Sequence, residues 1–144
     1  MYMGRILAID YGRKRTGLAV TDMLRITANP LVTIPTHTLE TWLREYFTKE
    51  QVDEVVIGHP YQMNGEDSES MQYIQPFINR FRKVFPNMPL KEYDERFTSV
   101  IAHRAMLDAG LKKKDRQNKA LVDEISATII LQTYLDSKNN NLNL

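Results

Sequence analysis

One continuous apolar run constrains the fold of this chain more than any other feature. Residues 6–9 lack the apolar and polar alternation of a strand that is half exposed to water. Such a run is typical of a strand buried on both faces, in a sheet that helices cover. The run ends at Asp10, and Gly12 and Gly17 then enclose the basic residues 13–15. The two glycines are expected to keep a tight turn after a buried carboxylate.

The hydrophobic periodicity of the rest of the chain predicts further strands that alternate with amphipathic helices. Strands are expected at residues 5–10, 17–21, 28–34, 53–58 and 90–94, and helices at residues 39–47, 74–85, 98–109 and 118–136. Thr38 and Thr98 are expected to cap the helices that follow them. The elements therefore predict an α/β fold rather than a purely helical or purely β fold.

The short link between the first two strands favours an antiparallel hairpin, and the later strands follow helices. Right-handed crossovers then place the first, fourth and fifth strands parallel in a five-stranded mixed sheet of order 3-2-1-4-5, flanked by helices. With 144 residues, the chain suits one domain over residues 1–137. The asparagine-rich residues 138–144 are expected to form a flexible tail.

Composition excludes several classes of protein. The absence of cysteine excludes a disulfide framework and a thiolate zinc site. No apolar run is long enough to cross a membrane, so we expect a soluble, cytoplasmic protein without a membrane partner. The net charge of +1 means that any affinity for nucleic acid must come from local clusters. Two basic clusters exist, at residues 13–15 and 112–119.

Polar motifs follow the three strands that are predicted to be parallel. They are Asp10, residues 58–60 and residues 94–96. Ligands of open α/β sheets bind outside the carboxyl ends of the strands, so these motifs form one candidate site. Asp123, near the start of the last helix, joins them because small residues at 126 and 127 allow this helix to approach the sheet.

Asp10, Glu95 and Asp123 provide the oxygen ligands that hard divalent cations prefer. Two such cations can activate water and stabilise the leaving oxygen of a phosphodiester. Each carboxylate also has a purely structural interpretation. Asp10 can start a turn, Glu95 can lie on the surface without a role, and Asp123 can stabilise a helix N-terminus through the helix dipole. If Glu95 turns away from Asp10, Asp94 takes its role.

Four segments then carry a resemblance to a known family: AIDYGRKRTGLAV, VVIGHPYQMNG, YDERFTS and VDEISATIILQTYL. In their order, they resemble the four motifs of the Holliday junction resolvase-like, YqgF/RuvX-type pre-16S rRNA nucleases. The resemblance spans residues 6–135. It implies a ribonuclease H-like fold and phosphodiester hydrolysis with Mg²⁺ or Mn²⁺, in the maturation of the 5′ end of 16S ribosomal RNA during ribosome biogenesis.

The resemblance also implies roles for particular residues. Asp10, Glu95 and Asp123 are the expected catalytic and metal-binding residues. From their charge and their place near these carboxylates, rather than from the resemblance, the expected nucleic-acid contacts are Arg13, Lys14, Arg15, Arg96 and Lys119. His59, where the family commonly has an aliphatic residue, can shuttle a proton, although a lone loop histidine is more often incidental. Precursor ribosomal RNA is the expected partner, together with the small ribosomal subunit.

Alternative functions remain open at this point. The fold analogy to junction resolvases favours branched DNA as substrate, for which a homodimer rather than a monomer supplies two related active sites. The phosphate-binding hairpin of actin-like ATPases has a similar pattern, but the chain has room for only one such domain and no P-loop. A non-catalytic RNA-binding module needs the basic clusters but not the carboxylates. The sequence leaves the choice between internal and terminal cleavage open.

Overall fold

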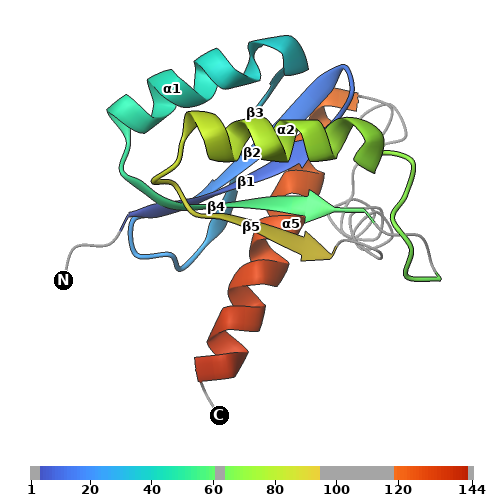
Figure 1. Ribbon diagram of the computed structural model, residues 1–144. Helices are drawn as coiled ribbons and strands as arrows, with labels where there is room; N and C mark the ends of the chain where they lie inside the picture. The colour runs from blue at the N-terminus through green and yellow to red at the C-terminus, as the bar shows by residue number, and fades with distance from the viewer. Residues whose placement is uncertain (1–3, 61–63, 95–118, 143–144) are drawn as a thin grey trace.

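A computed structural model of the protein describes residues 4–60, 64–94 and 119–142, in which a sheet lies between two layers of helices (Figure 1). The strands are β1 (Arg5–Tyr11), β2 (Arg15–Thr21), β3 (Ala28–Pro35), β4 (Val52–His59) and β5 (Leu90–Asp94). The helices are η1 (Thr36–Thr38, a 3₁₀ turn), α1 (Leu39–Lys49), α2 (Met71–Val84) and α5 (Lys119–Leu142).

The strand order β3-β2-β1-β4-β5 confirms the predicted topology. β1 pairs antiparallel with β2 and parallel with β4, and β4 pairs parallel with β5. The carboxyl ends of β1, β4 and β5 therefore share one edge of the sheet, as expected. Across the hairpins, Asp10 lies opposite Gly17, which in turn lies opposite Thr33.

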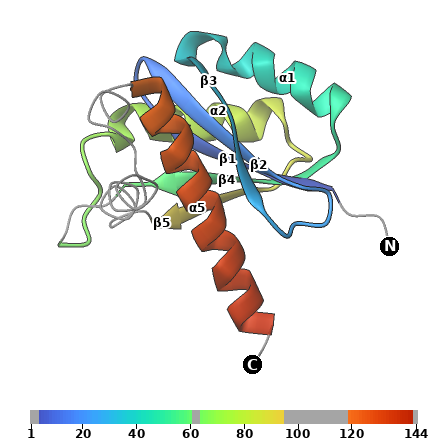
Figure 2. The ribbon, with the colours of Figure 1, turned by 180° about the vertical axis from the view of Figure 1, so that it is seen from behind.

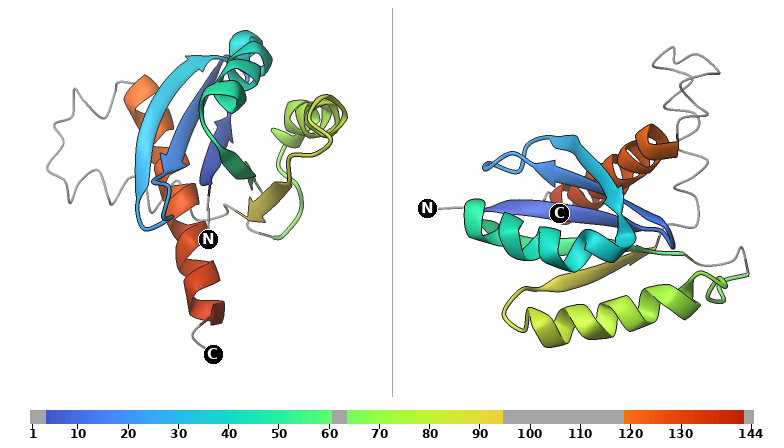
Figure 3. Two further views of the ribbon diagram at one scale, coloured as in Figure 1. Left: turned by 90° about the vertical axis from the view of Figure 1, so that its left-hand side faces the viewer. Right: turned by 90° about the horizontal axis from the view of Figure 1, so that it is seen from above.

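Helices cover both faces of the sheet, which explains the continuous apolar runs of its central strands. Because side chains alternate along a strand, Leu7 and Ile9 of β1 pack on the core that α1 and α2 cover. Ile6 and Ala8 pack on the other side, against Ala127 and neighbouring residues of α5. Figures 2 and 3 show α5 alone on its face of the described sheet, opposite α1 and α2.

Element ends differ from the predictions in informative places. Thr38 occupies the N-cap position of α1, but its side chain makes no capping hydrogen bond. Its hydroxyl donates to the Pro35 carbonyl at 2.7 Å instead, so the predicted cap is wrong in its bonding. Helix α5 continues past the expected end at residue 136 to Leu142, because no glycine or proline interrupts it. The helix predicted after Thr98 lies outside the described residues.

Among the described residues, no helix is long and apolar enough to cross a membrane.

Candidate active site

Asp10 lies near the carboxyl end of β1, on the sheet face that α5 covers. Its neighbours in the row across the sheet are Gly17 and Thr33. The first turn of α5 lies beside this row and beside the turn between β1 and β2 (Figures 1 and 2). The Thr33 hydroxyl donates to the Ala120 carbonyl at 2.7 Å and fixes the start of the helix over the strands.

Gly17 allows this close approach because it has no side chain. A Cβ atom added to Gly17 would lie 2.2 Å from the carbonyl oxygen of Asp123 and 3.0 Å from its Cβ. Any larger residue would push α5 away from β2. The predicted role of Gly17 in the turn is therefore wrong: the residue lies inside β2, and its small size brings Asp123 next to Asp10.

Two carboxylates thus lie close together at the end of β1. Burial and the negative charge of Asp123 raise the pKa of Asp10 to about 7. Arg15 Nε donates to Asp123 Oδ2 at 3.0 Å, and the side chain of Asp123 is 23% exposed. Arg15, expected to contact nucleic acid, thus forms an ion pair with this candidate catalytic carboxylate, and its contact with nucleic acid stays a prediction.

The turn between β1 and β2 is fixed from the side of η1. A Cβ atom on Gly12 would lie 2.1 Å from the Arg15 carbonyl oxygen, so this glycine does keep the turn tight. The Thr36 hydroxyl donates to the Gly12 carbonyl at 2.7 Å, and the Thr36 N–H donates to the Lys14 carbonyl at 3.0 Å. The exposed side chains of Arg13 and Lys14 therefore extend from a well-supported turn.

His59 lies between two carboxylates at the end of β4. Its Nδ1 is 2.8 Å from Glu92 Oε1, and its Nε2 is 2.8 Å from Asp67 Oδ1. Burial lowers the pKa of His59, but hydrogen bonds and charge from Asp67 and Glu92 outweigh it and raise the pKa overall. The histidine therefore joins β4 and β5 to the loop before α2, a role that its predicted position in a loop did not indicate.

The other predicted residues are distributed as follows. Asp94 ends β5, is exposed, and lies in register with His59. Lys119 is the first residue of α5. Glu95, Arg96 and residues 112–116 lie outside the described residues. Within the described ranges, no group of three or more acidic or histidine side chains could hold a metal ion, so Asp10 and Asp123 are the described pair of the predicted set.

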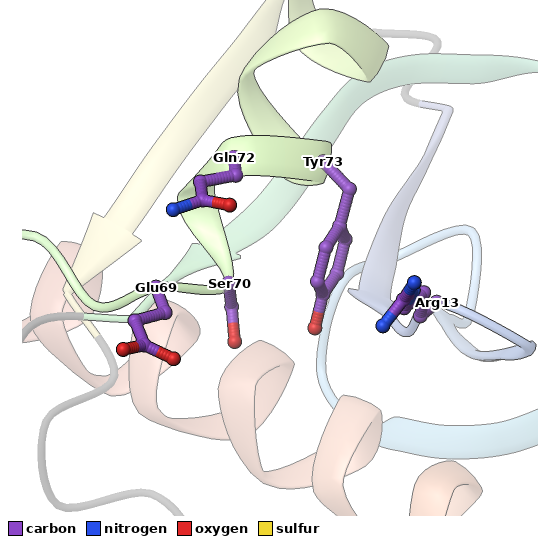
Figure 4. Close-up of a pocket in the computed structure, with 5 residues that line it drawn as sticks. All are labelled: Arg13, Glu69, Ser70, Gln72 and Tyr73. Carbon is purple, nitrogen blue, oxygen red and sulfur yellow. The ribbon is translucent and has the colours of Figure 1, made fainter.

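A cavity of about 490 Å³ lies between the turn after β1 and the start of α2 (Figure 4). Its lining residues are Arg13, Glu69, Ser70, Gln72 and Tyr73. Only Arg13 of these was a candidate from the sequence. The others carry no motif, and helical periodicity around Tyr73 gives no indication that it meets a turn so distant in the chain.

Comparisons with known proteins identify the family to which this sequence is similar. A family model described as RuvX, Holliday junction resolvase, matches residues 4–137. A relative from Phocaeicola vulgatus is 65% identical over 136 residues, which cover 94% of this chain and 98% of the relative. A relative from Flavobacterium johnsoniae is 60% identical over 94% of this chain and 99% of its own length. Both bear the name "Putative pre-16S rRNA nuclease".

A solved structure supports the ribonuclease H-like fold. It is T. thermophilus RuvC in complex with a Holliday junction substrate, with a TM-score of 0.57 over 94% of this chain and 96% of that chain. The two sequences are 14% identical, so the likeness concerns the fold alone.

Proposed function

The chain belongs to the RuvX family, and on that premise we propose that it is a nuclease that hydrolyses phosphodiester bonds of precursor 16S ribosomal RNA near the 5′ end. The name shared by its relatives supports this substrate. The observation that carries the proposal is the close approach of Asp10 and Asp123, from opposite ends of the chain, which Gly17 permits.

The two carboxylates fit divalent cations. Each offers hard oxygen ligands. Burial and the nearby charge of Asp123 both raise the pKa of Asp10, and a bound cation would offset both effects by favouring the charged carboxylate. Mg²⁺ or Mn²⁺ held by Asp10 and Asp123, with Glu95 as the proposed third ligand, would supply water activation and stabilisation of the leaving oxygen.

The protein's own cations complete the proposed site. Arg15 Nε lies 3.0 Å from Asp123 Oδ2 and holds this carboxylate by an ion pair. Within the described residues, neither Arg13 nor Lys14 has an ion-pair partner, so both can meet the phosphates of the substrate. We propose the same role for Arg96 and Lys119.

Branched DNA is the second candidate substrate, because the matching family model is described as a Holliday junction resolvase. Resolution of a junction requires two related active sites, and therefore a homodimer. The names of the relatives favour RNA over this alternative. The cytoplasmic location and contact with the small ribosomal subunit stay predictions.

One experiment tests the proposed function directly. Wild type, Asp10→Asn and Asp123→Asn are compared on a precursor 16S RNA fragment and on a four-way DNA junction, with Mg²⁺, with Mn²⁺ and with a chelator. We expect metal-dependent cleavage of the RNA by wild type and a loss of about 100-fold or more in both variants, because an amide keeps the shape but removes the charge that binds the cation.

Asp136→Asn provides the matched control, since it neutralises an exposed carboxylate on the same helix as Asp123. This variant should cut like wild type. Cleavage by Asp10→Asn at the wild-type rate would assign the activity to another site, whereas cleavage of the junction alone would establish the second candidate substrate.

A further inference from the structure

The cavity between the turn after β1 and the start of α2 is lined by an aromatic ring and by charged and polar side chains, which are the groups that bind nucleotides. We propose that it binds one unpaired nucleotide of the RNA, with the base stacked on Tyr73, the adjoining phosphate on Arg13 and an exocyclic amino group of the base on Glu69. The inference rests on the proposed nuclease function and extends it to the recognition of a nucleotide beside the cleaved bond.

The size and form of the cavity suit such a ligand. Its volume of about 490 Å³ falls within the range of roughly 300–1,000 Å³ that is usual for small-molecule sites. In Figure 4, the Tyr73 side chain extends from α2 and lies between Ser70 on one side and Arg13 on the other. An aromatic ring beside a guanidinium group is the combination on which unpaired bases stack.

The ring of Tyr73 is supported from the core. Its centroid lies 6.1 Å from that of Tyr11, and Tyr11 stacks on Phe77 with centroids 4.6 Å apart. Tyr73 itself is only partly buried. A ring held in place on one side and partly open to solvent loses little freedom when a base stacks on it.

The charges of the cavity favour a ligand with two different ends. Arg13 and Glu69 both line it, and among the described residues neither side chain has an ion-pair partner. A lone anion attracted to Arg13 would be repelled by Glu69. A nucleotide meets both residues, because its phosphate is an anion while the amino group of cytosine, adenine or guanine is a hydrogen-bond donor.

Helix α2 does not itself provide an anion site. The N–H groups of Met71, Gln72 and Tyr73 already donate to the carbonyls of Ser68, Glu69 and Ser70, at 3.1, 3.0 and 3.2 Å. Arg13 is therefore the group of the cavity that can bind the phosphate.

Polar side chains for the base remain available. Ser70 occupies the N-cap position of α2, but its hydroxyl makes no capping hydrogen bond, and both Ser70 and Gln72 line the cavity. Together with Glu69, these groups can hydrogen-bond the edge of an unpaired base.

The cavity also lies next to the candidate catalytic pair. Arg13 follows Asp10 by three residues, so their Cα atoms are at most about 11 Å apart. Asp10 faces α5, whereas Tyr11 packs on the side of α2. A strand that crosses the end of β1 can therefore have its cleaved phosphate at Asp10 and a neighbouring nucleotide in the cavity.

The test measures binding without cleavage. Labelled five-residue oligocytidylate and oligouridylate are titrated with the full-length protein in a chelator, and affinity is followed by fluorescence anisotropy. Tyr73→Leu should weaken oligocytidylate binding by about tenfold, while Tyr73→Phe keeps the ring and stays within about twofold of wild type. Glu69→Gln should reduce the preference for oligocytidylate over oligouridylate.

Tyr46→Leu is the matched control, because Tyr46 is a partly buried tyrosine that stacks on Trp42 in α1, away from the cavity. It should bind like wild type. Equal losses in Tyr73→Leu and Tyr46→Leu, an unchanged affinity in Tyr73→Leu, or no binding by wild type would each overturn the proposal.

If Tyr73→Leu fails to fold, Glu69→Gln still tests the proposal, because Glu69 is exposed and its substitution should not disturb folding. An unchanged preference for oligocytidylate over oligouridylate in Glu69→Gln would refute the proposed nucleotide site. Metal-dependent cleavage with unchanged binding in the Tyr73 variants would reject the cavity and retain the nuclease. If the variants show the expected changes in binding but wild type does not cleave RNA, the nucleotide site in the cavity is retained and the proposed nuclease function is rejected.

Discussion

At the residue scale, the site joins two carboxylates, of which Asp123 alone has a cationic partner among the described residues. Arg15 binds Asp123 and leaves Asp10 in a buried position beside a negative charge. The pKa of Asp10 rises from 3.8 in the unfolded chain to about 7 in the folded protein. Folding therefore favours the protonated form of Asp10. The stability that this protonated group contributes is fully present below pH 3.8 and is lost as the pH rises through about 7.

This linkage predicts that Asp10→Asn stabilises the metal-free protein, and more at pH 8 than at pH 4. Asparagine resembles the neutral carboxyl group, so the variant avoids the cost of the buried charge. One pKa unit corresponds to about 1.4 kcal/mol, so the shift sets an upper limit of about 4 kcal/mol for the gain at pH 8. Urea denaturation in a chelator measures the difference.

Asp136→Asn, at an exposed position of α5, should show no such dependence on pH. A gain for Asp10→Asn of the same size at both pH values would contradict the assigned cause.

At the scale of elements, α5 determines the site because both of its ends are fixed to the sheet. At its start, Thr33 bonds the Ala120 carbonyl. Toward its end, the buried Glu54 of β4 accepts hydrogen bonds from the Tyr134 hydroxyl and from Lys138 Nζ, the latter at 2.9 Å. Burial and the carboxylate of Glu54 raise the pKa of Tyr134, so its hydroxyl remains a donor.

Tyr134→Phe should therefore lower the free energy of unfolding by about 1–3 kcal/mol, because it leaves an oxygen of a buried carboxylate without its donor. Tyr46→Phe is the control, since among the described residues no hydrogen bond engages the Tyr46 hydroxyl. Denaturation of both variants by urea gives the comparison, and equal losses would show that the bond to Glu54 contributes nothing specific.

At the scale of the whole molecule, charge is local rather than global. The chain carries a net charge of +1, while Arg13 and Lys14 extend together from the turn after β1. A protein of this kind is expected to attract nucleic acid through local basic clusters and not through its overall charge.

The salt dependence of RNA binding should follow from this arrangement. Replacing both Arg13 and Lys14 by alanine should reduce the slope of log affinity against log salt by about 1.4, or about 0.7 for each phosphate contact with a single strand. Fluorescence anisotropy at several salt concentrations measures the slope. A Lys49→Ala, Lys83→Ala double variant removes the same charge from exposed positions near the ends of α1 and α2 and should leave it unchanged.

By itself, the sequence determined the elements of the sheet and their order. Continuous apolar runs mark strands buried on both faces, helical stripes mark the crossovers, and the right-handed rule then leaves few topologies for strands in this order. The placement of Asp10 at a strand end followed in the same way, because a strand ends where its apolar run ends.

Only the tertiary structure decided which distant groups meet. Gly17 appears as a turn residue in the sequence, yet its missing side chain admits α5 and brings Asp123 to Asp10. Nothing in the sequence around Arg15 indicates that it pairs with Asp123, more than a hundred residues away. His59 and Tyr73 gain their neighbours through strand register and helix packing. Local periodicity fixes the face on which a side chain lies, but the distance between two faces depends on how closely the elements pack.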